Sequence, residues 1–191
     1  MSPENKAGPP SPWAEFLEEL DALLLEQVQL RCIGGFVVSL FHGLPRVTGD
    51  VDYYSVLPSH CVRTLREMAG PESKLAKKYK LHLPHLAVNT MPEDWEARLV
   101  ELFPGRLKNL HLYAPDPYDL ILSKLERNSS KDRDDVAYLA QTLHLNPQLL
   151  RERYVKELRP YLASEGRHDL ILKLWIDACF QSANERETGE A

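Results

Sequence analysis

The 191-residue chain is 43% hydrophobic, which is enough for one domain with a buried core, alone or with a small appendage. Its formal net charge of −5 excludes a surface coated in positive charge for general nucleic-acid binding. Its three cysteines, Cys32, Cys61 and Cys179, are far apart and have neither disulfide nor metal spacing. No signal-peptide core or apolar run of ~20 residues is present. We therefore expect a cytoplasmic protein that does not contact membranes.

Both ends of the chain are polar, and residues 1–11 and 181–191 are predicted to be disordered tails. From Pro12 onward, apolar residues recur at helical spacing: Trp13, Phe16, Leu17, Leu20, Leu23, Leu24 and Val28. This pattern predicts a helix that packs on one face of a sheet, with Ser11 as its N-cap.

The next stretch contains a pair of adjacent glycines. Residues 30–33 are predicted to form a buried strand, Gly34 and Gly35 a turn, and residues 36–42 a short helix ending at Gly43. Glycines lack Cβ atoms, so at such a turn the backbone N–H groups and the helix N-terminus can approach a phosphate closely.

Two carboxylates follow in the segment after this turn. Asp50 and Asp52 stand two residues apart at the start of a strand predicted over residues 50–56, so they share one face. Closely spaced carboxylates suit a hard cation such as Mg²⁺, or Mn²⁺. A glycine pair alone is usually a plain turn, and an isolated pair of aspartates is usually an exposed strand edge. Together they favour a site for a metal and a triphosphate.

The middle of the chain mixes helical and extended patterns. Residues 58–70 are predicted to form a packing helix, and the basic run from Lys74 to Lys80 is better explained as a solvated helix face than as a nucleic-acid contact. His82 and His85 are interpreted as partly buried histidines rather than metal ligands. Residues 92–102 are predicted to be helical and residues 107–113 to form an exposed edge strand.

The remaining chain is predicted to be helical. A helix over residues 118–127 places Asp119 and Lys124 on one flank, and the next helix opens with Asp132 and Asp135 in its first turns. Residues 146–180 read as two helices separated near residues 164–166, the second burying the side chains Leu170, Leu174, Trp175 and Ala178.

The order and spacing of these motifs resemble a known family. Gly34-Gly35, followed after fourteen residues by Asp50-x-Asp52, resembles the signature of the nucleotidyltransferase superfold, which includes DNA polymerase beta. Residues 119–125 and 131–136 are similar to an uncharacterised bacterial branch related to the toxins of AbiE-type toxin–antitoxin systems. The resemblance covers residues 28–143. It implies an α/β fold, with a small mixed sheet flanked by helices over residues 12–143 and a C-terminal helical extension over residues 144–180.

The resemblance also implies roles for individual residues. Asp50 and Asp52 would bind the metal, while Lys124 and the backbone of Gly34 and Gly35 would contact the phosphates. Three further side chains are expected to assist nucleotide binding: Ser39, Arg46 and Thr48. Three acids are expected to support the site rather than bind metal: Asp119, Asp132 and Asp135. Asp132 and Asp135 are expected to do so through ion pairs with Lys124 or Arg46.

The implied activity is transfer of a nucleoside monophosphate from an NTP to a hydroxyl of RNA or protein, with a cognate antitoxin as partner. The superfold commonly supplies a third carboxylate as base, and no clear candidate is present; Asn89 stands near the expected position. The alternative is therefore a catalytically weak or inactive module that binds a nucleotide or a partner.

Overall fold

The computed structural model describes residues 8–46, 48–85 and 90–180. Residues 1–7 and 181–191 of the predicted tails, and Asn89, lie outside the described residues. Within the described ranges, no helix combines the length and apolarity needed to cross a membrane. The chain divides into two compact units, one built from Met1–Ala87 and Leu99–Pro115 and the other from Val88–Arg98 and Asp116–Ala191.

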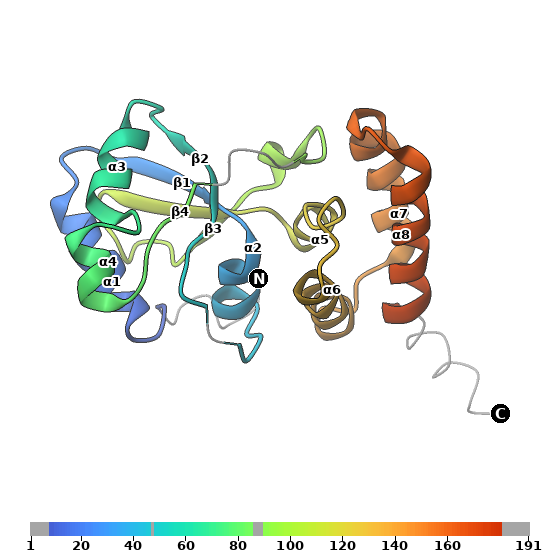
Figure 1. Ribbon diagram of the computed structural model, residues 1–191, viewed down its shortest axis with the longest axis horizontal. Helices are drawn as coiled ribbons and strands as arrows, with labels where there is room; N and C mark the ends of the chain where they lie inside the picture. The colour runs from blue at the N-terminus through green and yellow to red at the C-terminus, as the bar shows by residue number, and fades with distance from the viewer. Residues whose placement is uncertain (1–7, 47, 86–89, 181–191) are drawn as a thin grey trace. The chain divides into compact units, whose positions relative to one another are not determined.

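The first unit contains a four-stranded mixed sheet (Figure 1). Its strands, in the order β2-β1-β4-β3, are β2 Tyr53–Leu57, β1 Val28–Cys32, β4 Leu110–Ala114 and β3 Val100–Leu102. β1 pairs antiparallel with β2 and parallel with β4, and β3 pairs antiparallel with β4. The predicted α/β fold with a small mixed sheet flanked by helices is confirmed.

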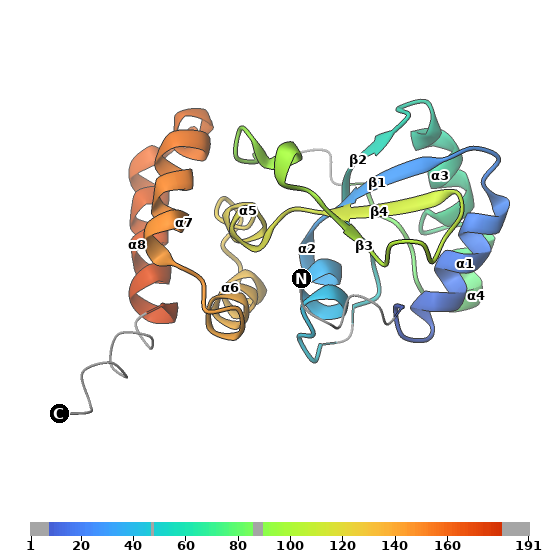
Figure 2. The ribbon, with the colours of Figure 1, turned by 180° about the vertical axis from the view of Figure 1, so that it is seen from behind.

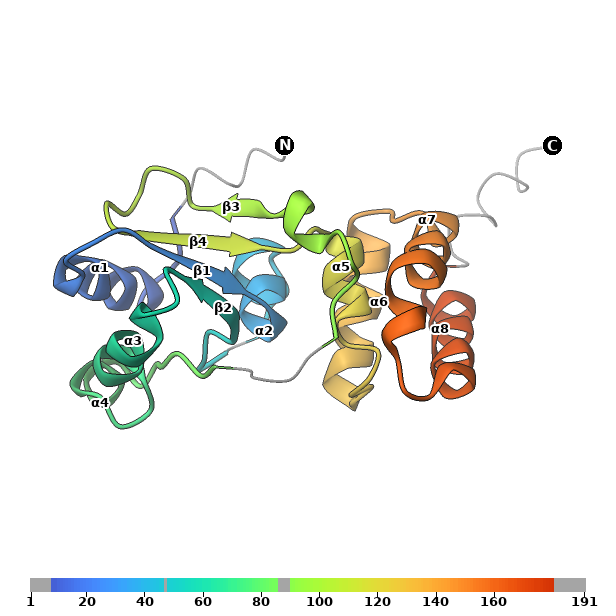
Figure 3. The same ribbon diagram turned by 90° about the horizontal axis from the view of Figure 1, so that it is seen from above.

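Helices cover the face of the sheet to which the central strands direct their apolar side chains. The helical elements of this unit are α1 Trp13–Leu23, α2 Gly34–Phe36, the π-helical turn η2 Val37–Phe41, α3 Cys61–Ala69 and α4 Lys74–Tyr79. α1 contacts α3 and α4 (Figure 3), and the ring of Trp13 lies 5.2 Å from that of Phe36 in α2. In β1, Leu30 is fully buried while its neighbour Gln29 is exposed, the alternation of a sheet with one covered face.

A carboxylate ties the end of α1 to the start of β4. Oδ1 of Asp21 accepts hydrogen bonds from the backbone amides of Asn109 and Leu110, both at 2.7 Å, and Oδ2 accepts one from Lys108 at 3.1 Å. Burial opposes ionisation of Asp21, but these hydrogen bonds outweigh it and lower the pKa of the carboxyl. The central strand is thereby fixed against the covering helix.

The second unit is helical. Its elements are η3 Trp95–Arg98, α5 Pro117–Leu122, α6 Ser130–Thr142, α7 Pro147–Arg153, η4 Tyr154–Leu158, η5 Arg159–Tyr161 and α8 Glu165–Cys179. α6 packs against α8 (Figure 2). Side chains cap three of the helices: Asp116 caps α5, Ser129 and Asp132 form a capping box on α6, and Asn146 caps α7.

Two neighbouring predictions in the middle of the chain are wrong for one reason. Residues 92–102 form the short turn η3 and then β3, where a continuous helix was expected. β3 pairs along the outer side of β4, so the strand predicted at an edge lies inside the sheet. A three-residue strand is too short to show a period of two, and only its partner reveals it.

Two details of the helices also differ from expectation. The N-cap of α1 is Pro12, without a side-chain hydrogen bond, where Ser11 was expected. In α8, Leu170 and Leu174 are 58% and 56% exposed, and Ala178 is also exposed, although they were predicted to be buried. The buried stripe of α8 instead consists of His168, Ile171, Leu172, Trp175 and Cys179. Two apolar stripes overlap in this sequence, and packing selects the one that contains the histidine.

Candidate functional site

The turn after β1 brings a glycine against a carboxylate. Gly34 has a φ of +76°, a conformation that side chains of L-residues disfavour. A Cβ atom on Gly34 would lie 2.5 Å from Oδ2 of Asp52, closer than any such contact allows. The backbone N–H of Ile33 also donates to the carbonyl oxygen of Asp52 at 2.9 Å. Both the backbone and the neighbouring acid therefore favour glycine at this position.

The second glycine faces a cation and a hydroxyl. A Cβ atom on Gly35 would lie 3.1 Å from Nη2 of Arg46 and 4.0 Å from Oγ1 of Thr48. The hydroxyl of Thr48 in turn donates to Oδ1 of Asp50 at 2.9 Å. The glycine pair, Arg46, Thr48 and the two aspartates thus come together at the end of β1, the end from which the chain enters α2.

Asp50 and Asp52 precede the strand in which they were predicted. β2 begins at Tyr53, and Asp50 makes only an isolated bridge with His82. Both aspartates are half-buried and flank the fully buried Val51, the alternation expected of side chains that share one side. Because they stand just before the regular ladder, their carboxylates are held at its end, where a ligand can approach.

Burial and charge shape the surroundings of the carboxylates. Burial of Cys32 raises the pKa of its thiol, and the negative charge of Asp52 raises it further. His42, half-buried after η2, has its pKa lowered to about 4 by burial, so its ring is neutral near pH 7. Ser39 in η2 is 7% exposed, and its hydroxyl oxygen has no hydrogen-bond partner among the described residues. Its contact with a nucleotide stays a prediction.

A short extended segment lies beside the two aspartates. The backbone N–H of Val51 donates to the carbonyl of His82 at 3.0 Å, and that of Tyr53 donates to the carbonyl of Pro84 at 3.2 Å. This segment runs parallel to residues 50–53, with His82 opposite Asp50 and His85 opposite Tyr53. Residues 81–85 contain no aspartate or glutamate. The position beside Asp50 therefore holds a histidine, which the sequence patterns gave no reason to place there.

The remaining candidate residues belong to the second unit, and three of them, Lys124, Asp132 and Asp135, interact with one another. Nζ of Lys124 donates to Oδ2 of Asp135 at 2.8 Å and lies 3.9 Å from Oδ1 of Asp132, so the predicted ion pairs with Lys124 are confirmed. All three side chains are at most 2% exposed. The contact that the resemblance implies between Lys124 and nucleotide phosphates is not addressed by these pairs and stays a prediction.

Asp119 is also buried within the second unit. Its carboxylate accepts two hydrogen bonds from Arg98, at 2.7 and 3.1 Å, and one from Arg153 at 3.1 Å. Burial raises the pKa of Asp119, while the charge and hydrogen bonds of Arg98 oppose that shift. These pairs join η3, α5 and α7, which gives Asp119 a structural role in its own unit.

One protein-family model matches residues 14–176, and its description is "Nucleotidyltransferase of unknown function (DUF6036)". The chain belongs to this family. The matched range contains every candidate residue named above. Comparisons with curated proteins and with solved structures give no match.

The two carboxylates at the end of β1 can be compared with the metal ligands that a nucleotidyltransferase would need. Asp50 and Asp52 offer only oxygen atoms, the donors that Mg²⁺ prefers. Mg²⁺ is usually held by one or two carboxylates, with substrate phosphates and water completing its octahedral shell. Two half-buried carboxylates, one of them oriented by Thr48, fit this requirement.

Proposed function

We propose that this chain transfers a nucleoside monophosphate from an NTP to a hydroxyl acceptor, RNA or protein, in a Mg²⁺-dependent reaction at the end of β1. The observation that carries the proposal is the close approach of Asp52 to Gly34, where an added Cβ atom would lie only 2.5 Å from Oδ2 of the carboxylate. This contact joins a turn suited to phosphates with a carboxylate suited to a cation. Membership of a nucleotidyltransferase family supports the same reaction class.

The glycine turn binds the triphosphate in this proposal. Backbone N–H groups near Gly34 and Gly35 donate to phosphate oxygens, and the missing Cβ atoms let those oxygens approach. The guanidinium of Arg46, next to Gly35, offers a planar set of donors that matches a phosphate. Ser39, whose buried hydroxyl oxygen has no partner among the described residues, is a further donor to the nucleotide.

Asp50 and Asp52 hold the metal, and Thr48 orients the carboxylate of Asp50 through its hydrogen bond. Bound there, Mg²⁺ would neutralise the triphosphate and stabilise the leaving pyrophosphate. Lys124 is predicted to add a positive charge to the phosphates. Positioning and electrostatic stabilisation supply most of the rate in reactions of this class.

His82 serves as the base for the acceptor in this proposal. It stands opposite Asp50, and imidazole is the commonest general base in enzymes. His82 takes the proton of the acceptor hydroxyl while the hydroxyl oxygen forms a bond to the α-phosphorus of the NTP. The bond from that phosphorus to the leaving pyrophosphate breaks. A histidine here replaces the third carboxylate that the resemblance implies.

Label transfer tests the activity directly. The protein is incubated with each α-labelled NTP, Mg²⁺ and total bacterial RNA or protein, beside the double variant Asp50→Asn, Asp52→Asn. We expect labelled acceptor with the native chain and none with the double variant. Asp134→Asn, an exposed acid on α6, is the matched control and keeps full activity. Equal labelling by the native chain and the double variant would refute the proposal.

The histidine is tested separately. We expect His82→Asn to lower the rate of label transfer by about 100-fold or more, with little change in NTP affinity. His85→Asn is the control, because His85 lies opposite Tyr53 and its ring centroid is 5.0 Å from that of the tyrosine. If both variants lose activity equally, the effect is structural and the base is another group.

A binding module without turnover is the second candidate. The absence of a carboxylate from residues 81–85 favours it, because the superfold commonly uses three acids. This candidate predicts Mg²⁺-dependent NTP binding by calorimetry, lost in the double variant, without release of pyrophosphate. Pyrophosphate release with any acceptor excludes it.

We further propose that the chain acts as a toxin of the AbiE-related branch, countered by a cognate antitoxin, on a DNA polymerase beta-like superfold. Only the motif resemblance supports this finer assignment. Expression in a bacterial host is expected to arrest growth, and Asp52→Ala is expected to relieve the arrest. Equal arrest by the variant would separate toxicity from nucleotidyl transfer.

A further inference from the structure

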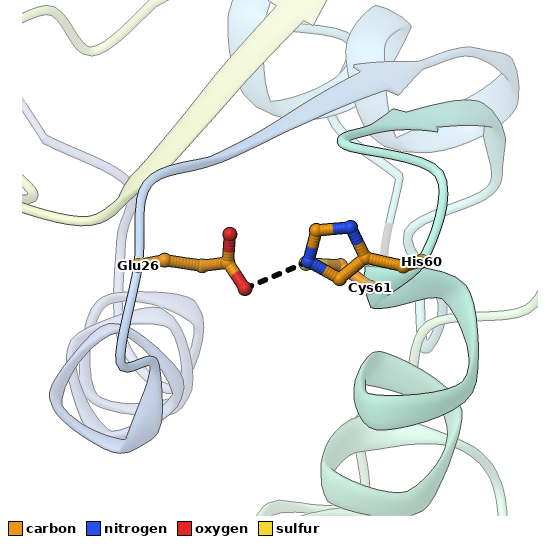
Figure 4. A group of neighbouring side chains, drawn as sticks. All are labelled: Glu26, His60 and Cys61. Carbon is orange, nitrogen blue, oxygen red and sulfur yellow. Dashed lines mark hydrogen bonds and ion pairs between the residues drawn. The ribbon is translucent and has the colours of Figure 1, made fainter.

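Three potential metal ligands meet at the other end of β1. Glu26, His60 and Cys61 each offer one ligand atom, and the three atoms lie within 4.8 Å of one another (Figure 4). Nε2 of His60 lies 2.8 Å from Oε1 of Glu26. Cys61 is 4% exposed, whereas the side chains of His60 and Glu26 are 67% and 52% exposed. The group therefore has one buried wall and one side open to solvent.

The strand register holds this group together. Gln29 pairs with Leu57 in the antiparallel β1–β2 ladder. Glu26 lies three residues before Gln29, and His60 lies three residues after Leu57. The start of one strand and the end of the other meet at the same end of such a ladder, so residues 26 and 60 face each other just beyond it. Cys61 follows as the first residue of α3. Two regular elements thus fix the positions from which the ligands project.

We propose that Glu26, His60 and Cys61 bind a zinc ion, with water as the fourth ligand. Carboxylate oxygen, imidazole nitrogen and thiolate sulfur are the ligands that zinc uses in proteins. Sulfur and nitrogen donors disfavour Mg²⁺ and Ca²⁺, which take oxygen ligands. The open side of the group leaves room for the water.

The contact between Glu26 and His60 requires only a small adjustment. Two nitrogen or oxygen ligands at about 2.1 Å from a tetrahedral zinc ion lie about 3.4 Å apart. The 2.8 Å contact between Glu26 and His60 therefore opens by about half an ångström on binding. Both side chains are exposed and can move by this amount, while the buried Cys61 stays in place.

A nucleophilic role for Cys61 fits the group less well. Burial raises the pKa of this thiol, and the charge and hydrogen bonding of Glu26 raise it further, so the free thiol is a poor nucleophile. A bound zinc ion reverses this balance, because it holds the sulfur as a thiolate and neutralises the carboxylate. The proposal is independent of the nucleotide site, which lies past the opposite end of β1.

Cobalt substitution gives a direct readout. Tag-free full-length chain is titrated with Co²⁺, and a thiolate-to-cobalt charge-transfer band is expected to saturate at one ion per chain and to disappear when Zn²⁺ is added. We expect Cys61→Ser to abolish the band and Cys179→Ser to keep it, since Cys179 belongs to the second unit. His60→Gln and Glu26→Gln, at exposed positions, are expected to weaken zinc binding by at least about 100-fold in calorimetry.

Every outcome decides the proposal. No charge-transfer band in the folded native chain, or a band that survives Cys61→Ser, would overturn it. Zinc affinity unchanged in both His60→Gln and Glu26→Gln would also overturn it, because both side chains are required as ligands. The spectra do not depend on activity, so failure of the proposed nucleotidyl transfer leaves this test intact.

Discussion

The ammonium group of Lys124 donates to Oδ2 of Asp135 at 2.8 Å, and each side chain is only 2% exposed. A buried ion pair contributes little by itself compared with an apolar pair, but removing one partner leaves a buried charge behind. Replacing one partner or both can therefore distinguish a structural role of Lys124 from a phosphate-binding role.

Replacing Lys124 by methionine is expected to lower the free energy of unfolding by about 3 kcal/mol, because Asp135 loses this counter-charge. The double variant Lys124→Met, Asp135→Asn is expected to recover most of that loss, as measured by urea unfolding. Lys131→Met, at an exposed position of α6, is the control. If Lys124 also reaches phosphates, NTP affinity falls in the double variant despite its restored stability; unchanged affinity would make the lysine purely structural.

Three glycines form a graded series for the nucleotide site. Gly34→Ala meets both a positive φ and Asp52, and we expect it to cost about 2 kcal/mol of stability and to lower activity by about 100-fold by displacing the carboxylate. Gly105 has a φ of +74° with nothing within 4 Å of an added Cβ, so Gly105→Ala should cost about 1 kcal/mol of stability and no activity. Gly166→Ala, in α8 with open space, should cost neither. Equal activity of Gly34→Ala and Gly105→Ala would contradict the proposed role of the Gly34–Asp52 contact.

The capping box of α6 predicts a pH dependence of stability. Burial of Asp132 opposes ionisation, but hydrogen bonds from Arg127 and Ser129, together with the charge of Arg127, outweigh it and lower the pKa of the carboxyl to about 2. Because the folded pKa lies below the ordinary value of 3.8, the stabilisation is present above about pH 4 and is lost as the pH falls through 2.

The gap between 3.8 and about 2 corresponds to about 2 kcal/mol. Asp132→Asn is therefore expected to be less stable than the native chain by about this amount at pH 6, with the difference vanishing toward pH 2. Unfolding curves across this range measure it. Asp134→Asn, exposed on the same helix, should show no such trend; a parallel trend in both variants would assign the effect to net charge.

Thr48 is expected to matter through the carboxylate that it orients. Thr48→Val removes the 2.9 Å hydrogen bond to Oδ1 of Asp50 and keeps the shape of the side chain. We expect the Mg²⁺ concentration for half-maximal label transfer to rise by about 10-fold. Thr64→Val, on the exposed side of α3, is the matched control. No change in metal dependence would show that Asp50 is positioned by other contacts.

Local patterns predicted much of the first unit. The helix from Trp13, the strand before the glycine pair and the turn itself depend on neighbours in sequence, so periodicity and glycine chemistry identify them. Predicting which residues meet in the candidate site required long-range pairing as well. His82 lies opposite Asp50 through a bridge between residues 32 positions apart, and no local pattern encodes that pairing.

The proposed zinc site likewise depends on contacts that sequence spacing does not show. Cys61 has no second cysteine near it, and the sequence spacing excluded a metal site. Its neighbours in space are His60 and Glu26, and the latter arrives through the β1–β2 register. The exposed Leu170 and Leu174 of α8 show the same limit, since only packing decides which apolar stripe a helix buries.

The route of the chain has a genetic consequence. The polypeptide leaves the first unit after Ala87, contributes Val88–Arg98 to the second, returns for Leu99–Pro115 and then leaves again. The carboxylates that bind Arg98 come from Asp119 and Glu157, beyond the last crossing. A chain truncated after Pro115 would contain Arg98 but neither Asp119 nor Glu157. The two units are therefore not interchangeable modules, and recombination at any single point between them would divide at least one.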